Sequence, residues 1–182
     1  MAISNKARIL KEQGKPVIGF GAGEPDFPTP LHVIEEVKIA SENPAYHKYT
    51  AVGGLPILRD EISRTTKKDS NFEIDPDNVV VTNGGKQAIL TTFMSLLDPG
   101  DEVLIPSPYW TTYPEAVKIS GGEPVIVNTD FENDFKVTVE QLEEKFTEKT
   151  KVLVWVSPSN PTGVVYSKEE AEEIYQWVFE ND

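Results

Sequence analysis

The sequence predicts an α/β domain whose sheet is largely parallel. Short apolar runs, such as Val79–Thr82 and Lys151–Val156, alternate along the chain with longer segments of helical periodicity. Runs without a polar face are typical of parallel strands, because helices cover both sides of such a sheet. The alternation itself indicates βα units that follow one another along the chain.

The residues before Asp75 predict three helices separated by irregular segments. The helices are expected over 4–13, 30–41 and 56–68. Thr29 and Pro30 provide an N-cap and a first-turn proline for the second helix. The third helix is expected to turn its apolar residues inward, namely Ile57, Leu58 and Ile62. Val17–Phe20 predicts a brief buried strand, whereas 21–30 and 43–55 are too rich in turn-forming residues for regular structure.

From Asp75 onward, strands and helices alternate. Strands are expected over Val79–Thr82, Glu102–Ile105, Pro124–Asn128 and Lys151–Val156. Helices are expected after Lys86 as a core helix to Leu97, then over 110–119, over 138–146 and from Ser167 to the end of the chain. The last two begin with a capping-box pattern, a Ser or Thr followed three residues later by Gln or Glu.

Composition excludes several classes of function. The 17 basic and 30 acidic residues give a net charge of −13, which disfavours a nucleic-acid partner. The chain has no cysteine and only two histidines, so we expect neither disulfides nor a metal site. No apolar run reaches the roughly 20 residues of a membrane span, and the charged start does not resemble a signal peptide. We therefore expect a cytoplasmic protein without a membrane partner.

The segment Asn83-Gly84-Gly85-Lys86 joins a predicted strand to a predicted helix. A glycine turn at this place leaves backbone N–H groups free at the helix start, where the helix dipole also favours an anion. A Walker loop is excluded, because Val80 replaces its first glycine and Gln87 its Ser or Thr. No G-x-G-x-x-G fingerprint is present either. The alternative interpretation is a plain turn whose glycines allow tight packing.

Three loops are expected at the carboxyl ends of parallel strands, where ligands bind in such sheets. Besides Gly84-Gly85, they contain Tyr109-Trp110 and Asn160. Together they offer donors for a phosphate, aromatic rings for stacking and an amide, which suits a flat phosphorylated ring. Taken singly, each has a structural alternative: turn glycines, half-buried aromatics and a loop stiffened by prolines.

Five long motifs give the chain a specific resemblance. They are GAGEPDFPTP at 21–30, KYTAVGGLPILRDEI at 48–62, VTNGGKQA at 81–88, LDPGDEVLIPSPYWTTYPE at 97–115 and SPSNPTGVVYSKEE at 157–170. In this order they resemble the class I aminotransferases that depend on pyridoxal phosphate, especially the bacterial aspartate aminotransferase subgroup. The resemblance implies a three-layer sandwich, with 1–30 as part of a small N-terminal α/β domain and 31–182 as an incomplete large domain.

The resemblance also implies roles for single residues toward the cofactor, pyridoxal 5′-phosphate. Gly84, Gly85 and Lys86 match the segment that binds its phosphate. Trp110 matches the residue that stacks on its ring and lines the substrate site, and Asn160 matches the asparagine that binds the ring hydroxyl near the substrate carboxylate. For Lys86, a cationic contact with an acidic substrate and a solvated surface position remain alternatives.

Two further matches concern the substrate and the assembly. Gly23 matches a glycine whose backbone meets the substrate. Tyr49 matches a tyrosine that reaches the cofactor phosphate of a neighbouring subunit, which implies a homodimer. Members of the family move an amino group between an amino acid, here aspartate by subgroup, and a 2-oxo acid.

The chain departs from the family pattern beyond its last predicted helix. The Ser-x-x-Lys segment with the Schiff-base lysine is absent, as are the aspartate, tyrosine and arginine that the family places in the same half. None of Lys145, Lys149, Lys151 and Lys168 lies in a matching context. We therefore expect the N-terminal half of an aminotransferase, inactive alone. The alternative is a non-catalytic chain that binds the cofactor or pairs with another chain.

Overall fold

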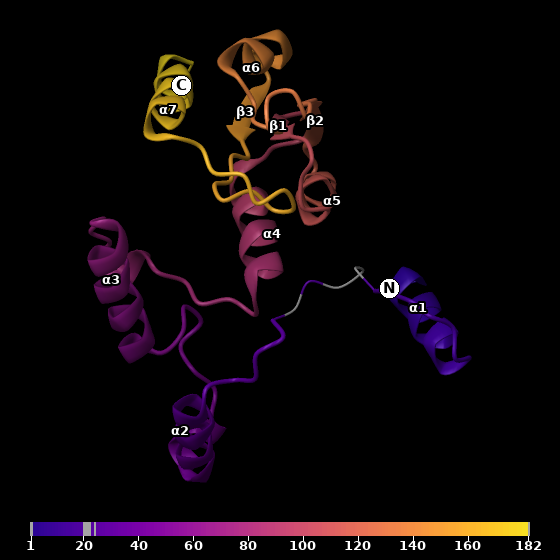
Figure 1. Ribbon diagram of the computed structural model, residues 1–182. Coiled ribbons are helices and arrows are strands. Elements are labelled where there is room, and N and C mark those ends of the chain that lie inside the picture. The colour runs from indigo at the N-terminus through magenta and orange to yellow at the C-terminus, as the bar shows by residue number, and fades with distance from the viewer. Residues whose placement is uncertain (1, 20–22, 24, 182) are drawn as a thin grey trace. The chain divides into compact units, whose positions relative to one another are not determined.

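The computed structural model describes residues 2–19, 23 and 25–181 (Figure 1). The chain divides into two compact units, Met1–Ala51 and Val52–Asp182. No helix in the described ranges is long and apolar enough to span a membrane. The expected domain boundary after residue 30 refers to the complete family fold and stays a prediction.

The first unit is helical. It contains α1 (Ala2–Glu12), α2 (Leu31–Glu42) and the short 3₁₀ helix η1 (Pro44–His47). Pro30 is the N-cap residue of α2 and not, as predicted, its first helical residue. The predicted strand is wrong for residues 17–19, where Ile18 is 81% exposed and no second strand of the described unit offers a partner. Phe20 lies outside the described residues.

The second unit contains a parallel sheet, as predicted. Its strands are β1 (Glu102–Pro106), β2 (Glu123–Val127) and β3 (Thr150–Leu153), in the order β2-β1-β3. Leu104 of the central strand pairs with Val125 on one side and with Leu153 on the other. All three strands therefore end at the same edge of the sheet, and their following loops start there.

Helices cover both faces of this sheet in three layers (Figure 1). On one face lie α4 (Gly85–Leu96) and α5 (Thr112–Ile119), and on the other α6 (Val139–Lys145) and α7 (Lys168–Glu180). The first core cluster contains Phe93, Leu97, Val103, Ile105, Ala116 and Val117. The second contains Leu104, Val127, Val137, Leu142, Ile174 and Trp177. Successive residues of β1 thus serve opposite faces, as the strand pleat requires.

Both predicted capping boxes are confirmed. At the start of α6, the N–H of Gln141 donates to Thr138 Oγ1 and the N–H of Thr138 donates to Gln141 Oε1. Ser167 and Glu170 form the same reciprocal pair at the start of α7, with distances of 3.1 and 2.6 Å. The remaining boundaries differ by a few residues; α5, for example, begins at Thr112 and not at Trp110.

The predicted strand Val79–Thr82 is wrong. Val80 is 65% exposed, and the segment makes one backbone hydrogen bond outside itself and its neighbouring turns, from the N–H of Val81 to the carbonyl of Gly53 at 2.9 Å. A strand requires a neighbouring strand for its ladder. The described sheet consists of β2-β1-β3, and residues 79–82 pair with none of these strands.

Two predicted apolar faces are more exposed than expected. In α3 (Pro56–Ser70), Ile57 is 74% exposed and Leu58 is also exposed, whereas Ile62 is half-buried. This helix packs against the 3₁₀ helix η2 (Pro76–Asn78) and not against the sheet. In α4, which was expected to be a core helix, Phe93 is buried but Met94 is exposed. The periodicity of apolar residues correctly predicted both helices. It does not show which element, if any, packs against their apolar faces.

The central strand provides a test of the core. Replacing the fully buried Leu104 by Ala removes packing from the α6–α7 side of the sheet. We expect the free energy of unfolding to fall by about 3 kcal/mol. Leu96→Ala, at an exposed position on α4, serves as control and is expected to cost under about 1 kcal/mol. Urea unfolding measures both, and equal losses would contradict this account of the core.

Candidate functional site

The start of α4 presents free backbone donors. Gly84 precedes the helix with φ 83° and ψ 169°, and no side chain caps the helix by accepting from its first turn. The N–H of Gly84 donates to the Thr82 carbonyl, and that of Asn83 donates to Gln87 Oε1. Within the described part of the chain, the N–H groups of Gly85, Lys86 and Gln87 have no acceptor. The predicted anion-binding end of the helix is therefore present in its geometry.

Lys86 and Trp110 are brought together by the fold. The Lys86 Nζ lies 4.6 Å from the centroid of the Trp110 ring, a cation–π contact. The Trp110 ring in turn meets Tyr113 edge to face, with centroids 5.6 Å apart. The start of α4 and the loop that follows β1 thus form one continuous surface.

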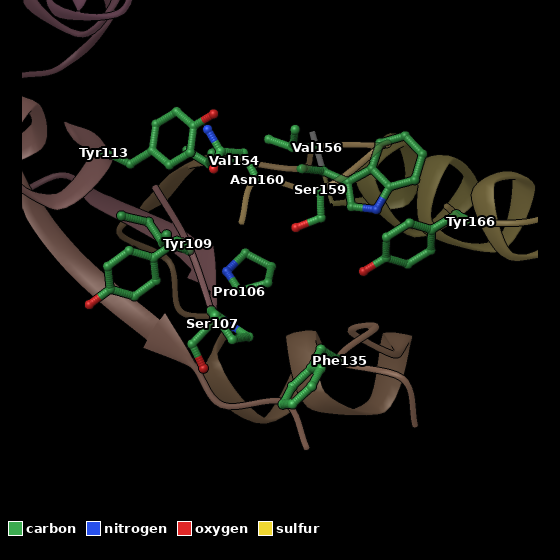
Figure 2. A pocket seen from close by; sticks show the side chains of 13 residues that line it. Pro106, Ser107, Tyr109, Tyr113, Phe135, Val154, Val156, Ser159, Asn160 and Tyr166 are labelled. Carbon is green, nitrogen blue, oxygen red and sulfur yellow. The ribbon is translucent and has the colours of Figure 1, made fainter. Parts of the chain in front are cut away.

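A small pocket connects the loop after β1 with the loop after β3 (Figure 2). Tyr109, in the loop after β1, and Tyr113, at the start of α5, line one side of the pocket. Ser159 and Asn160, in the loop after β3, line the other side. The cavity of about 20 Å³ has room for about one water molecule, so it cannot itself hold a pyridine ring. A ring ligand would have to lie on the more open surface around Trp110.

The loop Ser157–Gly163, hereafter the Asn160 loop, is closed by its own hydrogen bonds. The N–H of Ser159 donates to the Val164 carbonyl at 2.9 Å, and the N–H of Gly163 donates to the Ser159 carbonyl at 2.8 Å. Asn160 itself is exposed. Its side chain forms no hydrogen bond with any described residue, so the amide is available to a ligand.

Two predicted site residues lie in the other unit. Gly23 and Tyr49 belong to Met1–Ala51, where both are exposed. Space for a side chain is open around Gly23, because apart from its chain neighbours no atom of the described chain lies within 4 Å of an added Cβ. The roles predicted for these two residues stay predictions.

Three residues that the sequence analysis did not single out, Tyr113, Tyr166 and Lys136, lie in or beside this site, and Glu170, predicted only as a capping residue, pairs with one of them. Tyr113 lines the pocket, and burial raises the pKa of its phenol. Tyr166 lines the same pocket and accepts a hydrogen bond from the N–H of Val137 at 2.8 Å. Lys136 Nζ contacts both carboxylate oxygens of Glu170 at 2.9 and 2.8 Å. Only Tyr113 had a local signal, three residues after Trp110; the partners of the others are about 30 residues away.

The Lys136–Glu170 pair has an electrostatic consequence. The hydrogen bond from Lys136 lowers the pKa of the Glu170 carboxyl, and the N–H of Ser167 contributes in the same direction. The side chains of Lys136 and Glu170 are 20% and 40% exposed, so solvent screens the pair only in part. The carboxylate both caps α7 and holds the segment before α6.

With this geometry in place, comparison with known proteins assigns the chain to a family. The family model for aminotransferase class I and II matches residues 15–182. The chain belongs to this family. It is 56% identical over 180 residues to an aspartate aminotransferase of Streptomyces avermitilis, covering 99% of this chain and 44% of the relative. A probable aspartate aminotransferase of Streptomyces griseus is 53% identical, with 100% of this chain and 84% of the relative covered.

A solved aminotransferase has the same fold. The structure of aspartate aminotransferase from Thermus thermophilus with maleate matches with a TM-score of 0.92 and 41% identity. The match covers 100% of this chain and 47% of that one. The chain thus spans just under half the length of this structure and of the Streptomyces avermitilis relative. The expected family and the three-layer α/β fold are confirmed.

The glycines at the start of α4 can be tested by a matched pair. Gly84→Ala places a side chain at φ 83°, a conformation that is essentially restricted to glycine, and is expected to cost at least about 1 kcal/mol of stability. Gly85 is helical and has open space around it, so Gly85→Ala is expected to change stability by less than about 0.5 kcal/mol. Thermal unfolding of both variants measures these losses. A Gly84→Ala variant as stable as the parent chain would contradict the turn geometry.

The Lys136–Glu170 pair predicts a pH dependence. Because the folded pKa of Glu170 lies below its unfolded value of about 4.3, the pair stabilises the fold above about pH 5. This stabilisation is lost as the pH falls through the folded pKa. Glu170→Gln keeps the capping box but removes the charge, and should lower the Tm by about 1–3 °C at pH 7.

The control for this prediction lies one residue earlier. Glu169 occupies the same first turn of α7 and forms no ion pair with a described residue, so Glu169→Gln removes the same charge without the contact. The Tm difference between the two variants should vanish once the pH lies below the folded pKa of Glu170, where the carboxyl is protonated in both states. A difference that persists there would contradict the ionic origin of the effect.

Proposed function

We propose that this chain forms the part of a pyridoxal-phosphate-dependent aspartate aminotransferase that holds the phosphate and the ring of the cofactor. The contact of Lys86 with Trp110 at the uncapped start of α4 carries the proposal. It joins a phosphate-binding helix end to an aromatic ring, which is the combination that a phosphorylated pyridine requires. The family match supports the same cofactor.

The start of α4 suits the phosphate group. The N–H groups of Gly85, Lys86 and Gln87 are free of acceptors in the described structure, and the helix dipole adds partial positive charge at the same place. Apart from adjacent residues and the backbone of α4, no atom of the described chain lies within 4 Å of a Cβ added at Gly84 or Gly85, so an anion has room to approach the backbone. In this proposal the ammonium of Lys86 adds a full charge beside the phosphate or meets the side-chain carboxylate of an acidic substrate.

The neighbouring loops suit the ring. Trp110 is half-buried, which fixes the indole while leaving part of it accessible for stacking. The exposed amide of Asn160 can donate a hydrogen bond to the ring hydroxyl and another to a substrate carboxylate. When bound, pyridoxal phosphate supplies an electron sink for the carbanion that forms as the substrate loses its α-proton. The residues of this chain hold and orient it.

The lysines of the second half of the chain do not suit attachment to the cofactor. Lys145 lies 3.6 Å from Glu144, Lys151 lies 3.9 Å from Asp101, and Lys168 lies 3.4 Å from Glu172. These three are ion-paired, Lys149 is exposed, and none of the four lines the pocket beside Asn160. We therefore propose that the Schiff-base lysine lies outside this chain and that the chain alone does not transaminate.

The names of the relatives support a proposal for the substrates. Two of them are named as aspartate aminotransferases, which supports aspartate as the amino donor and a 2-oxo acid as the acceptor. We propose a homodimer in which Tyr49 reaches the cofactor phosphate of the neighbouring subunit. The complete exposure of the Tyr49 side chain is consistent with a residue that acts on another chain.

Binding of pyridoxine 5′-phosphate tests the proposed site. This probe carries the phosphate, the ring and its hydroxyl but no aldehyde, so it does not react with surface lysines. We expect it to quench tryptophan fluorescence and to bind at least about tenfold more tightly than pyridoxine, because a phosphate at a helix start forms charge-assisted hydrogen bonds. Lys86→Ala and Trp110→Ala should each weaken binding by about five- to tenfold.

The control for these variants is Lys118→Ala, which removes an exposed lysine of α5 that pairs with Glu115. It should bind the probe as the parent chain does. Equal affinity for pyridoxine and its phosphate, or parent-like binding by Lys86→Ala and Trp110→Ala, would contradict the proposed site.

Catalytic competence is tested separately. The chain is incubated with pyridoxal phosphate, reduced with borohydride and digested, and the modified lysines are located by mass spectrometry. We expect scattered adducts below one per chain and no transfer of the amino group of aspartate to 2-oxoglutarate. A single stoichiometric lysine adduct together with turnover would overturn the proposed inactivity. Binding without turnover would also fit a non-catalytic cofactor-binding chain.

A further inference from the structure

The position of Asn160 has to be set by its loop. The Asn160 side chain makes no hydrogen bond within the described structure and is exposed, so no direct partner orients it. The loop backbone therefore has to provide the orientation, and it does so only if both ends of the loop are fixed. One end follows β3 through residues 154–156, and the first of these, Val154, donates its N–H to the Leu104 carbonyl of β1. The other end runs through Tyr166 into α7.

Three contacts of Tyr166 fix this second end of the loop. Its hydroxyl accepts a hydrogen bond from the N–H of Val137 at 2.8 Å. Its own N–H donates to Ser157 Oγ at 3.2 Å, which joins the end of the loop to its beginning. Its ring packs edge to face against Trp155, with centroids 5.0 Å apart. Tyr166 thus connects both ends of the Asn160 loop to the segment before α6.

The Lys136–Glu170 ion pair also connects the segment before α6 to the residues around Tyr166. Lys136 adjoins Val137, and its Nζ lies 5.8 Å from the centroid of the Tyr166 ring. Glu170 accepts from Lys136 Nζ and from the N–H of Ser167, the residue that follows Tyr166. Two separate contacts therefore tie the sequence pair Lys136-Val137 to the residues around Tyr166.

We propose that Tyr166, supported by the Lys136–Glu170 pair, is a positioning residue that sets Asn160 for its contact with the pyridine ring of the cofactor. The contact itself rests on the proposed function, whereas the fixing of the loop does not. Tyr166 is proposed to act through the backbone, because its hydroxyl accepts from the N–H of Val137 and its own N–H donates to Ser157 Oγ. Figure 2 shows Asn160 and Tyr166 on different parts of the pocket wall.

Tyr166→Phe is the decisive variant, because it removes only the hydroxyl that accepts from Val137. We expect hydrogen exchange at the N–H groups of Ser159 and Gly163 to accelerate by at least about fivefold, since both are bonded across the loop. Exchange in the middle of α4 should not change. Tyr175→Phe, at an exposed position of α7, is the matched control and should leave the loop unchanged.

A double-mutant cycle shows whether the effect passes through Asn160. We expect Tyr166→Phe and Asn160→Ala each to weaken binding of pyridoxine 5′-phosphate by about five- to tenfold. The double variant should bind no more weakly than Asn160→Ala alone, because a misplaced loop cannot harm a contact that is already removed. Additive losses would show that Tyr166 acts elsewhere and would overturn the proposal.

The two measurements separate the inference from the proposed function. If the parent chain does not bind the probe, the proposed function fails, and hydrogen exchange alone still decides whether Tyr166 fixes the loop. Unchanged exchange in Tyr166→Phe overturns the inference even where the probe binds. Lys136→Gln provides a second variant with a smaller expected effect on the same amides, in case Tyr166→Phe does not fold.

Discussion

Parallel pairing around β1 is the constraint on which the second unit depends. Because β1 pairs in the same direction with β2 and β3, the loops that leave these strands start from one edge of the sheet. This edge carries Trp110 after β1 and Asn160 after β3. The side chains of β1 alternate between the two core clusters, so the strand that aligns the loops also joins the two helical layers.

The sequence predicted the features that local chemistry determines. The capping boxes at Thr138 and Ser167 need only a hydroxyl and a carboxamide or carboxylate three residues apart, and both were found where expected. The parallel sheet, and the position of the loops after β1 and β3 at the same edge of it, follow from the alternation of strands and helices. The strand at 79–82 and the burial of Ile57 failed for a different reason. Both depend on a distant partner, which no local pattern of apolar residues reveals.

The same distinction applies to the site. A glycine before a helix, and an aromatic residue and an asparagine in loops after strands, are recognisable by type, so Gly84, Trp110 and Asn160 could be proposed from the sequence. Tyr166 was missed because its role comes from Val137, which lies 29 residues earlier in the chain. The residues that would touch a ligand were therefore easier to predict than the one that holds a loop in place. Supporting contacts of this kind are long-range by nature, and they become visible only in the folded chain.

The ammonium of Lys86 over Trp110 also affects how a ligand competes for the ring. While no ligand is bound, the Lys86 ammonium covers part of the Trp110 indole and shields it from other apolar surfaces. A ring that stacks on the same face must displace it and give up about 0.5–1 kcal/mol, which lowers the apparent affinity by about two- to fivefold. A ring that stacks on the opposite face avoids this cost. Which face a ligand selects therefore determines whether the Lys86 ammonium must first leave the ring.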